Sequence, residues 1–227
     1  MKRLLVVFDF DGLLLNSYGL LRDTFAAFGL DVGDENRFKN RRKFLKYFGG
    51  GKELGRNLAQ IALPKKKRIR EALTEHYMSS GRIFTCFTPF INRCIEHPDV
   101  HTGVLSRNYT MRPGKTIRKV LNNSGVDESN LDFVIPIPVG AKKHDALQAM
   151  SSVRYELNLF GGDEVGDYKA ATDSGYTALM ASYGFDNASR LIKHANVPRD
   201  RIFHSPESIV QAFAEIADPY LKLDGDR

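Results

Sequence analysis

A twelve-residue stretch near the N-terminus, Val6 to Ser17, constrains the fold of this chain more than any other part of it. It begins inside an apolar run with strand character, Leu4 to Phe8, and Asp9 and Asp11 come directly after that run. Because side chains two positions apart in a strand point the same way, the two carboxylates should lie together at the strand's end. Gly12 allows the chain to turn sharply straight after them.

Two carboxylates held this close repel each other unless something compensates their charge. A hard cation such as Mg²⁺, which prefers oxygen ligands, provides that compensation. One carboxylate can then act as a nucleophile and the other as a general acid and base. The alternative is a strand that ends in two solvated Asp residues before a turn. Motifs elsewhere in the chain are needed to distinguish the two interpretations.

The length and composition indicate a globular protein with a hydrophobic core. The chain has 227 residues, 42% of them hydrophobic, which fits one domain with an insertion or two small domains. Cys86 and Cys94 are too few for a disulfide framework and are typical of a reducing compartment. The apolar run at the N-terminus is broken by Asp9 after about five residues, too short for a signal peptide. We therefore expect a cytoplasmic protein.

The net charge of +6 is spread unevenly along the chain. Residues 37–82 contain fourteen basic and only three acidic residues, so the remainder of the chain is mildly acidic. The same segment reads as helices over 38–48 and 53–61, followed by a last helix that Pro64 should begin and residues 80–81 should end. Ile69, Leu73 and Tyr77 lie four positions apart in that last helix. Charge and pattern together separate a basic helical region from the rest.

From residue 88 onward, short apolar runs alternate with helical patterns. The expected strands are 101–105, 133–135, 157–160, 177–181 and 201–204, and the expected helices are 89–96, 115–123, 143–153, 165–174, 189–195 and 207–217. This alternation predicts a parallel, doubly wound sheet. Active sites in such sheets lie beyond the carboxyl ends of the strands.

Several polar residues fall at those ends in an order that resembles the haloacid dehalogenase (HAD) superfamily. The stretch Val6 to Ser17 is similar to its motif I, hydrophobic-D-x-D-G-x-L-x-x-S, and Ser106 after Gly-Val-Leu is similar to motif II. A lysine before a helix is motif III. Lys142 and Lys143 both qualify, and Lys143 is preferred because the apolar residues after it fall at the family's offsets. Residues 162–167, Gly-Asp-Glu-Val-Gly-Asp, resemble motif IV, G-D-x-x-x-D.

The resemblance implies an α/β fold with a Rossmann-like core, residues 1–16 and 86–227, and a small all-helical cap, residues 17–85. It also implies a role for each matched residue. Asp9 attacks phosphorus, Asp11 acts as acid and base, the Ser106 hydroxyl binds a phosphoryl oxygen, and Lys143 offsets negative charge. The implied catalytic residues are Asp9, Asp11, Ser106 and Lys143. The implied Mg²⁺ ligands are Asp9, the Asp11 carbonyl and Asp163, and Asp167 would orient them from outside the coordination sphere. The implied substrate contacts are Gly12, Arg107, Asn108, Lys52 and Arg56.

The expected activity is that of a magnesium-dependent phosphatase that hydrolyses a small phosphate monoester through an aspartyl phosphate. Asp11 favours phosphate esters, because the dehalogenases of the superfamily lack this second Asp. Lys52 and Arg56 follow a triple glycine and suggest a substrate with a second anionic group. We expect an anionic phosphorylated metabolite as partner, no membrane or nucleic acid, and a monomer or weak homodimer. The alternatives are a phosphomutase of the β-phosphoglucomutase type and a nucleic-acid-binding module that keeps the fold.

Overall fold

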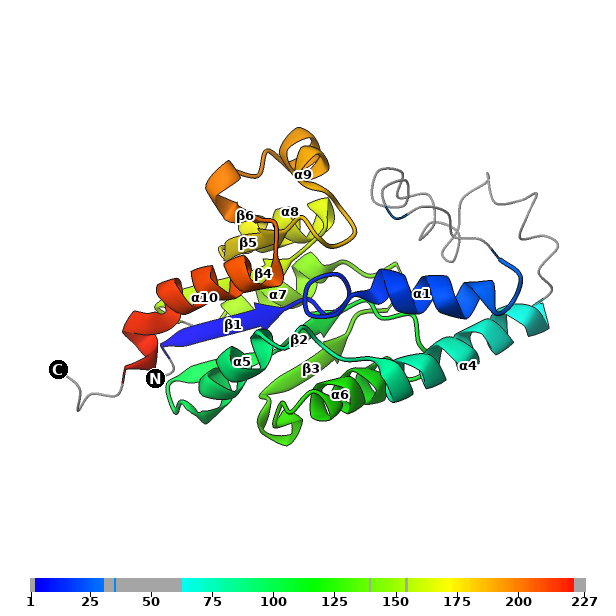
Figure 1. Cartoon of the computed structure of the whole chain (residues 1–227). Helices are drawn as coiled ribbons and strands as arrows, with labels where there is room; N and C mark the ends of the chain where they lie inside the picture. Colours follow the sequence, from blue (N-terminus) through cyan, green and yellow to red (C-terminus); the bar gives the residue numbers. More distant parts are fainter. Residues whose placement is uncertain (1–2, 31–34, 36–62, 139, 154, 223–227) are drawn as a thin grey trace.

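The computed structural model describes residues 3–30, 35, 63–138, 140–153 and 155–222 (Figure 1). Its described part is built on a six-stranded sheet in the order β3-β2-β1-β4-β5-β6, with every neighbouring pair parallel. The strands are β1 (Leu4–Phe8), β2 (Val100–Ser106), β3 (Phe133–Pro136), β4 (Leu157–Gly162), β5 (Thr177–Ala181) and β6 (Ile202–Phe203). The predicted doubly wound parallel sheet is therefore confirmed.

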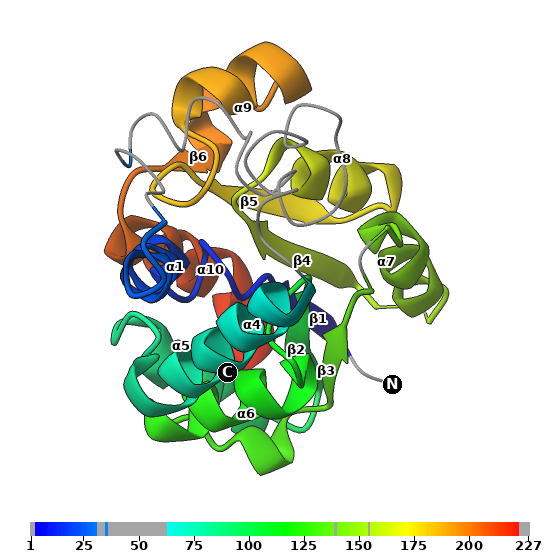
Figure 2. The same cartoon turned by 90° about the vertical axis from the view of Figure 1, so that its right-hand side faces the viewer.

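Helices cover both faces of this sheet, as Figure 2 shows. The described helices are α1 (Ser17–Ala26), α4 (Leu63–Ser80), α5 (Phe87–Glu96), α6 (Pro113–Asn123), α7 (Lys143–Ser151), α8 (Val165–Asp173), α9 (Ala188–Ala195) and α10 (Pro206–Leu221). Buried residues of α5, α6 and α10 pack on one face of the sheet, and those of α7, α8 and α9 pack on the other. Short 3-10 turns at Glu128–Asn130 and Arg199–Arg201 were not predicted.

The central strand β1 is buried on both of its faces, as its continuous apolar sequence requires. Leu4, Val6 and Phe8 belong to one hydrophobic cluster, and Leu5 and Val7 belong to the cluster on the opposite face. This division follows from the alternation of side chains along a strand. The two carboxylates that follow β1 are thus attached to the most enclosed strand of the sheet.

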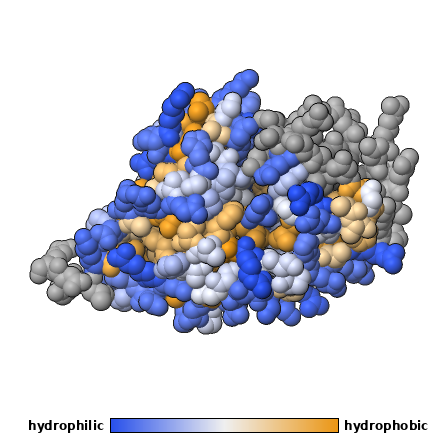
Figure 3. Space-filling view, in the orientation of Figure 1, coloured by the Kyte–Doolittle hydropathy of each residue, from blue (hydrophilic) through white to orange (hydrophobic). Residues whose placement is uncertain are grey.

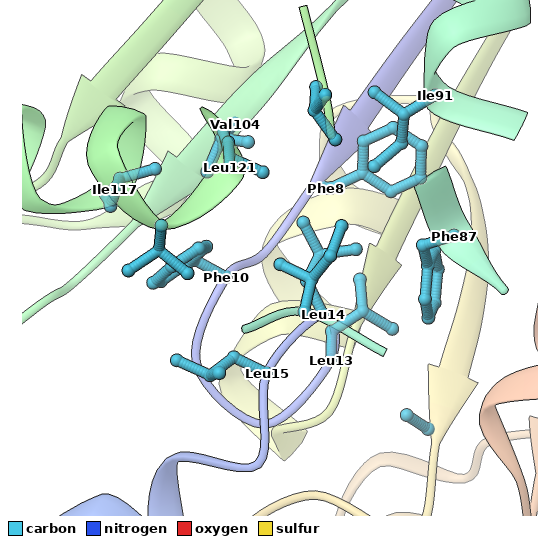
Figure 4. Close-up of a cluster of buried hydrophobic side chains, with 14 of the residues drawn as sticks. Phe8, Phe10, Leu13, Leu14, Leu15, Phe87, Ile91, Val104, Ile117 and Leu121 are labelled. Atoms are coloured by element: carbon cyan, nitrogen blue, oxygen red, sulfur yellow. The ribbon is translucent and has the colours of Figure 1, made fainter. Parts of the chain in front are cut away.

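The loop after β1 is held by its own apolar side chains. Phe10, Leu13, Leu14 and Leu15 are buried and extend the cluster around Phe8 (Figure 4). The polar residues between them are therefore left to point the other way. Apolar anchoring of this kind makes the turn part of the core and fixes the direction of the carboxylates.

The helical ends of the predicted cap are described, whereas its middle is not. The prediction that Pro64 begins a helix and that residues 80–81 end it is confirmed, since α4 spans Leu63–Ser80. This helix packs against α1 and also against α6 of the core. The expected helices at 38–48 and 53–61, together with Lys52 and Arg56, lie outside the described residues. The division into core and cap stays a prediction.

Two boundary predictions were wrong in an instructive way. The strand expected at 201–204 is only two residues long. The last helix runs on to Leu221 because Ala217 and Leu221 continue its buried face past the predicted end.

Figure 3 shows hydrophilic residues over most of the viewed face, with a more hydrophobic band that runs along α10 toward α1. Among the described residues, none of the helices combines the length and apolar character needed to cross a bilayer.

Candidate active site

Two adjacent strands deliver the first carboxylates of the site. Asp9 follows β1 and Asp163 follows β4, and both side chains are buried. The two strands pair in parallel, and the Asp9 amide donates to the carbonyl of Gly161 at 2.8 Å. The strand order reverses between β1 and β4, which is where sheets of this kind bind ligands. Asp9 and Asp163, two of the predicted site residues, therefore lie side by side at this edge of the sheet.

Lys143 joins these carboxylates from the first position of α7. Its Nζ lies 2.7 Å from Oδ2 of Asp9 and 2.9 Å from Oδ1 of Asp167, and only 4% of its side chain is exposed. Asp167 lies in the first turn of α8, where its side chain caps the amide of Glu164. Lys142 is exposed. Of the two candidate lysines, the structure therefore brings Lys143 to the predicted nucleophile.

The cluster contains three carboxyl groups and one lysine. Burial raises the pKa of Asp9 to about 8 even though Lys143 opposes this change. Burial and the neighbouring Asp9 raise the pKa of Asp163 well above its usual value. Burial also opposes the ionisation of Asp167, but Lys143 outweighs it and lowers the pKa of Asp167. The single lysine thus favours the ionised form of Asp167, whereas the negative charge of Asp9 and Asp163 is not fully compensated.

These residues fit a divalent cation. Oxygens of Asp9, Asp163 and Asp167 lie within 4.8 Å of one another, a spacing that one ion could bridge. Oδ1 of Asp163 is buried and has no hydrogen-bond partner among the described residues, whereas Oδ2 accepts from the amide of Phe185 at 2.6 Å. An orphaned carboxylate oxygen in the interior is costly unless a cation or water binds it.

Two glycines make room for Asp163. A Cβ atom on Gly12 would lie 2.1 Å from Oδ2 of Asp163, and one on Gly184 would lie 2.3 Å from the same atom. Gly12 also has a φ of +88°, which favours glycine. It was predicted to contact the substrate. The structure places it where the chain turns against the Asp163 carboxylate, and its contact with a substrate stays a prediction.

Asp11 is held in a different way from Asp9. Its Oδ1 accepts hydrogen bonds from the hydroxyls of Ser17 at 2.6 Å and Tyr77 at 2.7 Å, and its Oδ2 accepts one from the side-chain amide of Asn108 at 2.9 Å. Burial raises the pKa of Asp11, and these three donors oppose the change. The side chain of Asp11 is not part of the carboxylate cluster. The predicted metal contact through its backbone carbonyl stays a prediction.

The predicted catalytic residues share one small cavity of about 50 Å³. Asp9, Asp11, Ser106 and Lys143 line it, with Arg107 beside them. The Ser106 hydroxyl is buried without a partner among the described residues, so it is free to bind an incoming oxygen. The remaining lining residues are Leu21, Leu73, Tyr77, Tyr109, Glu164 and Phe185.

Two predicted substrate contacts have partners within the protein. Asn108 binds Asp11, and its Oδ1 accepts from the amide of Thr110 at 3.1 Å, which fixes the orientation of the side chain. Arg107 donates to the carbonyl of Ala141 at 3.0 Å while still lining the cavity. A role for either residue in substrate binding stays a prediction.

Sequence reasoning missed Tyr77, Gly184 and the role of Ser17. Tyr77 was assigned to the apolar stripe of its helix, where its burial was correctly expected. A hydroxyl at the end of such a stripe is a usable signal, because a buried tyrosine normally needs a hydrogen-bond partner. Gly184 gave no signal, since its importance depends on the proximity of Asp163 in the fold.

Comparisons with known proteins agree with this architecture. A HAD-like hydrolase from Streptococcus pneumoniae superposes with a TM-score of 0.59 at 17% identity, covering 92% of this chain and 97% of that one. A predicted phosphoglycolate phosphatase from Haemophilus somnus gives 0.60 at 17% identity, covering 94% and 99%. A β-phosphoglucomutase from Clostridium difficile gives 0.54 at 17% identity, covering 97% and 99%.

No protein-family model matches the chain, and no curated protein matches its sequence. The structural matches nevertheless cover nearly the whole of both chains, so the chain has the HAD-like α/β fold. The predicted resemblance to this superfamily is confirmed at the level of the fold. Since function is carried by sites rather than by folds, the reaction has to be argued from the residues of the cavity.

Proposed function

We propose that the protein is a magnesium-dependent phosphatase that hydrolyses a phosphate monoester through an aspartyl phosphate on Asp9. The observation that carries the proposal is the contact of Asp9 with Lys143, inside a buried cluster that also contains Asp163 and Asp167. A structural salt bridge needs one carboxylate for one lysine. Three buried carboxylates around one lysine, beside a cavity, are typical of a functional site.

Four residues of the cavity, Asp9, Asp11, Ser106 and Lys143, have a chemical task in this reaction. Asp9 attacks phosphorus, and the bond to the leaving oxygen breaks as Asp11 protonates that oxygen. Asp11 then takes a proton from the water that hydrolyses the aspartyl phosphate. Lys143 and the Ser106 hydroxyl, which line the cavity, would bind phosphoryl oxygens as negative charge develops on them.

Asp9 and Asp163 would hold Mg²⁺, with Asp167 and Lys143 next to them. When bound, the ion supplies positive charge that offsets the phosphate and the carboxylates. Backbone geometry keeps Asp9 aimed, because its Oδ1 accepts from the amide of Phe10 at 2.7 Å. This contact leaves Oδ2, the oxygen bonded to Lys143, on the side of the lysine.

The test is a screen of phosphorylated metabolites for phosphate release, with Mg²⁺ and with excess chelator. We expect release that needs Mg²⁺ and disappears in Asp9→Asn, because the amide is nearly isosteric but a far weaker nucleophile. Isomerisation of a sugar phosphate without release would instead favour the phosphomutase alternative. Release that continues in chelator, or in a folded Asp9→Asn variant, would contradict the proposal.

A further inference from the structure

The hydroxyl of Tyr77 reaches the acid and base of the proposed reaction from outside the sheet. Its Oη lies 2.7 Å from Oδ1 of Asp11, and 3% of the Tyr77 residue is exposed. The other side-chain donors to Asp11 among the described residues are Ser17, the first residue of α1, and Asn108, in the loop after β2. Tyr77 lies on α4, which also presents Leu73 to the same cavity.

The donors divide the two oxygens of Asp11 into different roles. Oδ1 accepts from both Ser17 and Tyr77, and two hydrogen bonds fill the lone pairs of a carboxylate oxygen. Among the described residues, Oδ2 accepts one hydrogen bond, from Asn108, so one of its lone pairs is open. This pattern assigns a proton that Asp11 carries to Oδ2, the oxygen with an open lone pair, and Asp11 lines the cavity.

We propose that Tyr77 is a positioning residue for this proton transfer, holding Oδ1 of Asp11 so that Oδ2 is the oxygen that gives and takes the proton. The inference rests on the proposed phosphatase function. In the first step the Oδ2 proton moves to the leaving oxygen as the bond to phosphorus breaks. In the second step Oδ2 takes a proton from the attacking water.

The placement of α4 is fixed by polar contacts with the segment that carries Asn108. Arg70 donates to the carbonyls of Tyr109 and Thr110, both at 3.1 Å, and the amide of Met111 donates to the Thr74 hydroxyl at 2.8 Å. The helix and this segment therefore hold their donors in one arrangement around Asp11. Packing alone would bury Tyr77 without these hydrogen bonds between α4 and the segment that carries Asn108.

The test compares Tyr77→Phe with Tyr176→Phe. Tyr176 is a matched control, because its buried hydroxyl also makes one hydrogen bond, to the carbonyl of Leu147 at 3.1 Å, within the cluster on the opposite face of the sheet. The substrates are phosphate monoesters with leaving groups that range from acidic phenols to alkyl alcohols. The quantity measured is kcat/KM, which reports the step in which the leaving group departs.

We expect Tyr77→Phe to lose about tenfold or more in kcat/KM on alkyl phosphates, the loss that one hydrogen bond to a charged group represents. On the ester of the most acidic phenol the loss should be small, because that leaving group needs no proton. Tyr176→Phe should show no such dependence. Ser17→Ala should show the same dependence as Tyr77→Phe, because Ser17 holds the same oxygen.

The outcomes separate this inference from the proposed function. If the wild type hydrolyses none of the esters with Mg²⁺, the function is wrong and the inference falls with it. If the wild type is active and Tyr77→Phe loses the same factor on every ester, only the inference is wrong. A stability cycle checks the contact without turnover: Tyr77→Phe should lower the urea midpoint less in an Asp11→Ala background. Equal shifts in both backgrounds would also overturn the inference.

Discussion

Replacing Lys143 with methionine should destabilise the protein by about 3–5 kcal/mol in chelator, the cost of removing one partner from a buried ion pair. The Nζ of Lys143 serves two carboxylates at 2.7 and 2.9 Å, and 4% of the side chain is exposed. Methionine keeps most of the volume and removes the charge. Asp9 and Asp167 would then be buried without a cation, together with Asp163. The loss therefore measures charge rather than packing.

The measurement is urea unfolding at neutral pH, in chelator and in excess Mg²⁺. We expect the loss to be smaller in Mg²⁺, because the ion returns positive charge to the same carboxylates. Lys142→Met is the matched control, since Lys142 is the preceding residue and is exposed. Its substitution should change the free energy of unfolding by about 0.5 kcal/mol or less.

Two results would refute the reasoning. One is a Lys143→Met variant that is no less stable in chelator than Lys142→Met, which would mean that the pair seen at 2.7 Å contributes nothing. The other is a loss of equal size with and without Mg²⁺. That result would be compatible with the Lys143 salt bridges, but it would contradict the argument that the carboxylate cluster needs the positive charge of a cation.

Four further predictions follow from the site and the chain around it. Asp9→Asn should abolish turnover with unchanged circular dichroism; activity within tenfold of wild type would contradict its role as nucleophile. Asp163→Ala and Gly184→Ala should both weaken Mg²⁺ binding in calorimetry, the second because its Cβ would displace the carboxylate. In chelator, the stability of wild type relative to Asp9→Asn should fall as pH rises from about 4 to about 8, because the pKa of Asp9 is raised from 3.8 to about 8 and the buried charged form is disfavoured. Lys52→Ala and Arg56→Ala should raise KM for a substrate with a second anionic group, and much less for p-nitrophenyl phosphate, which has none.

The part of the site that sequence predicted is local in the chain. Asp9 and Asp163 directly follow a strand and Ser106 is the last residue of one, so a correct strand assignment places their side chains at one edge of the sheet. Lys143 required one more step, the choice of the helix start. The structure supports that choice, because Lys143 is buried among carboxylates and Lys142 is not.

The part that sequence did not predict depends on packing between distant segments. Tyr77 is separated from Asp11 by 66 positions and reaches it only because α4 packs against α1 and α6. Gly184 matters because the loop after β5 passes within contact distance of Asp163. Neither the Tyr77–Asp11 contact nor the Gly184–Asp163 contact leaves a recognisable spacing or periodicity in a single sequence. The apolar stripe on α4 predicted where Tyr77 is buried, but not what its hydroxyl binds.

The contrast between Asp9 and Asp11 explains how two adjacent carboxylates can do different chemistry. Asp9 lies against a full positive charge on Lys143 and belongs to the cluster that fits a cation. In the part of the chain that the structure describes, the side chains that donate to Asp11 are all neutral, and its carboxylate lies outside that cluster. A bound cation would therefore lower the pKa of Asp9 more than that of Asp11. With the ion bound, the environment would favour an ionised Asp9 beside an Asp11 that can still hold a proton, the division of roles that the proposed reaction requires of its two carboxyl groups.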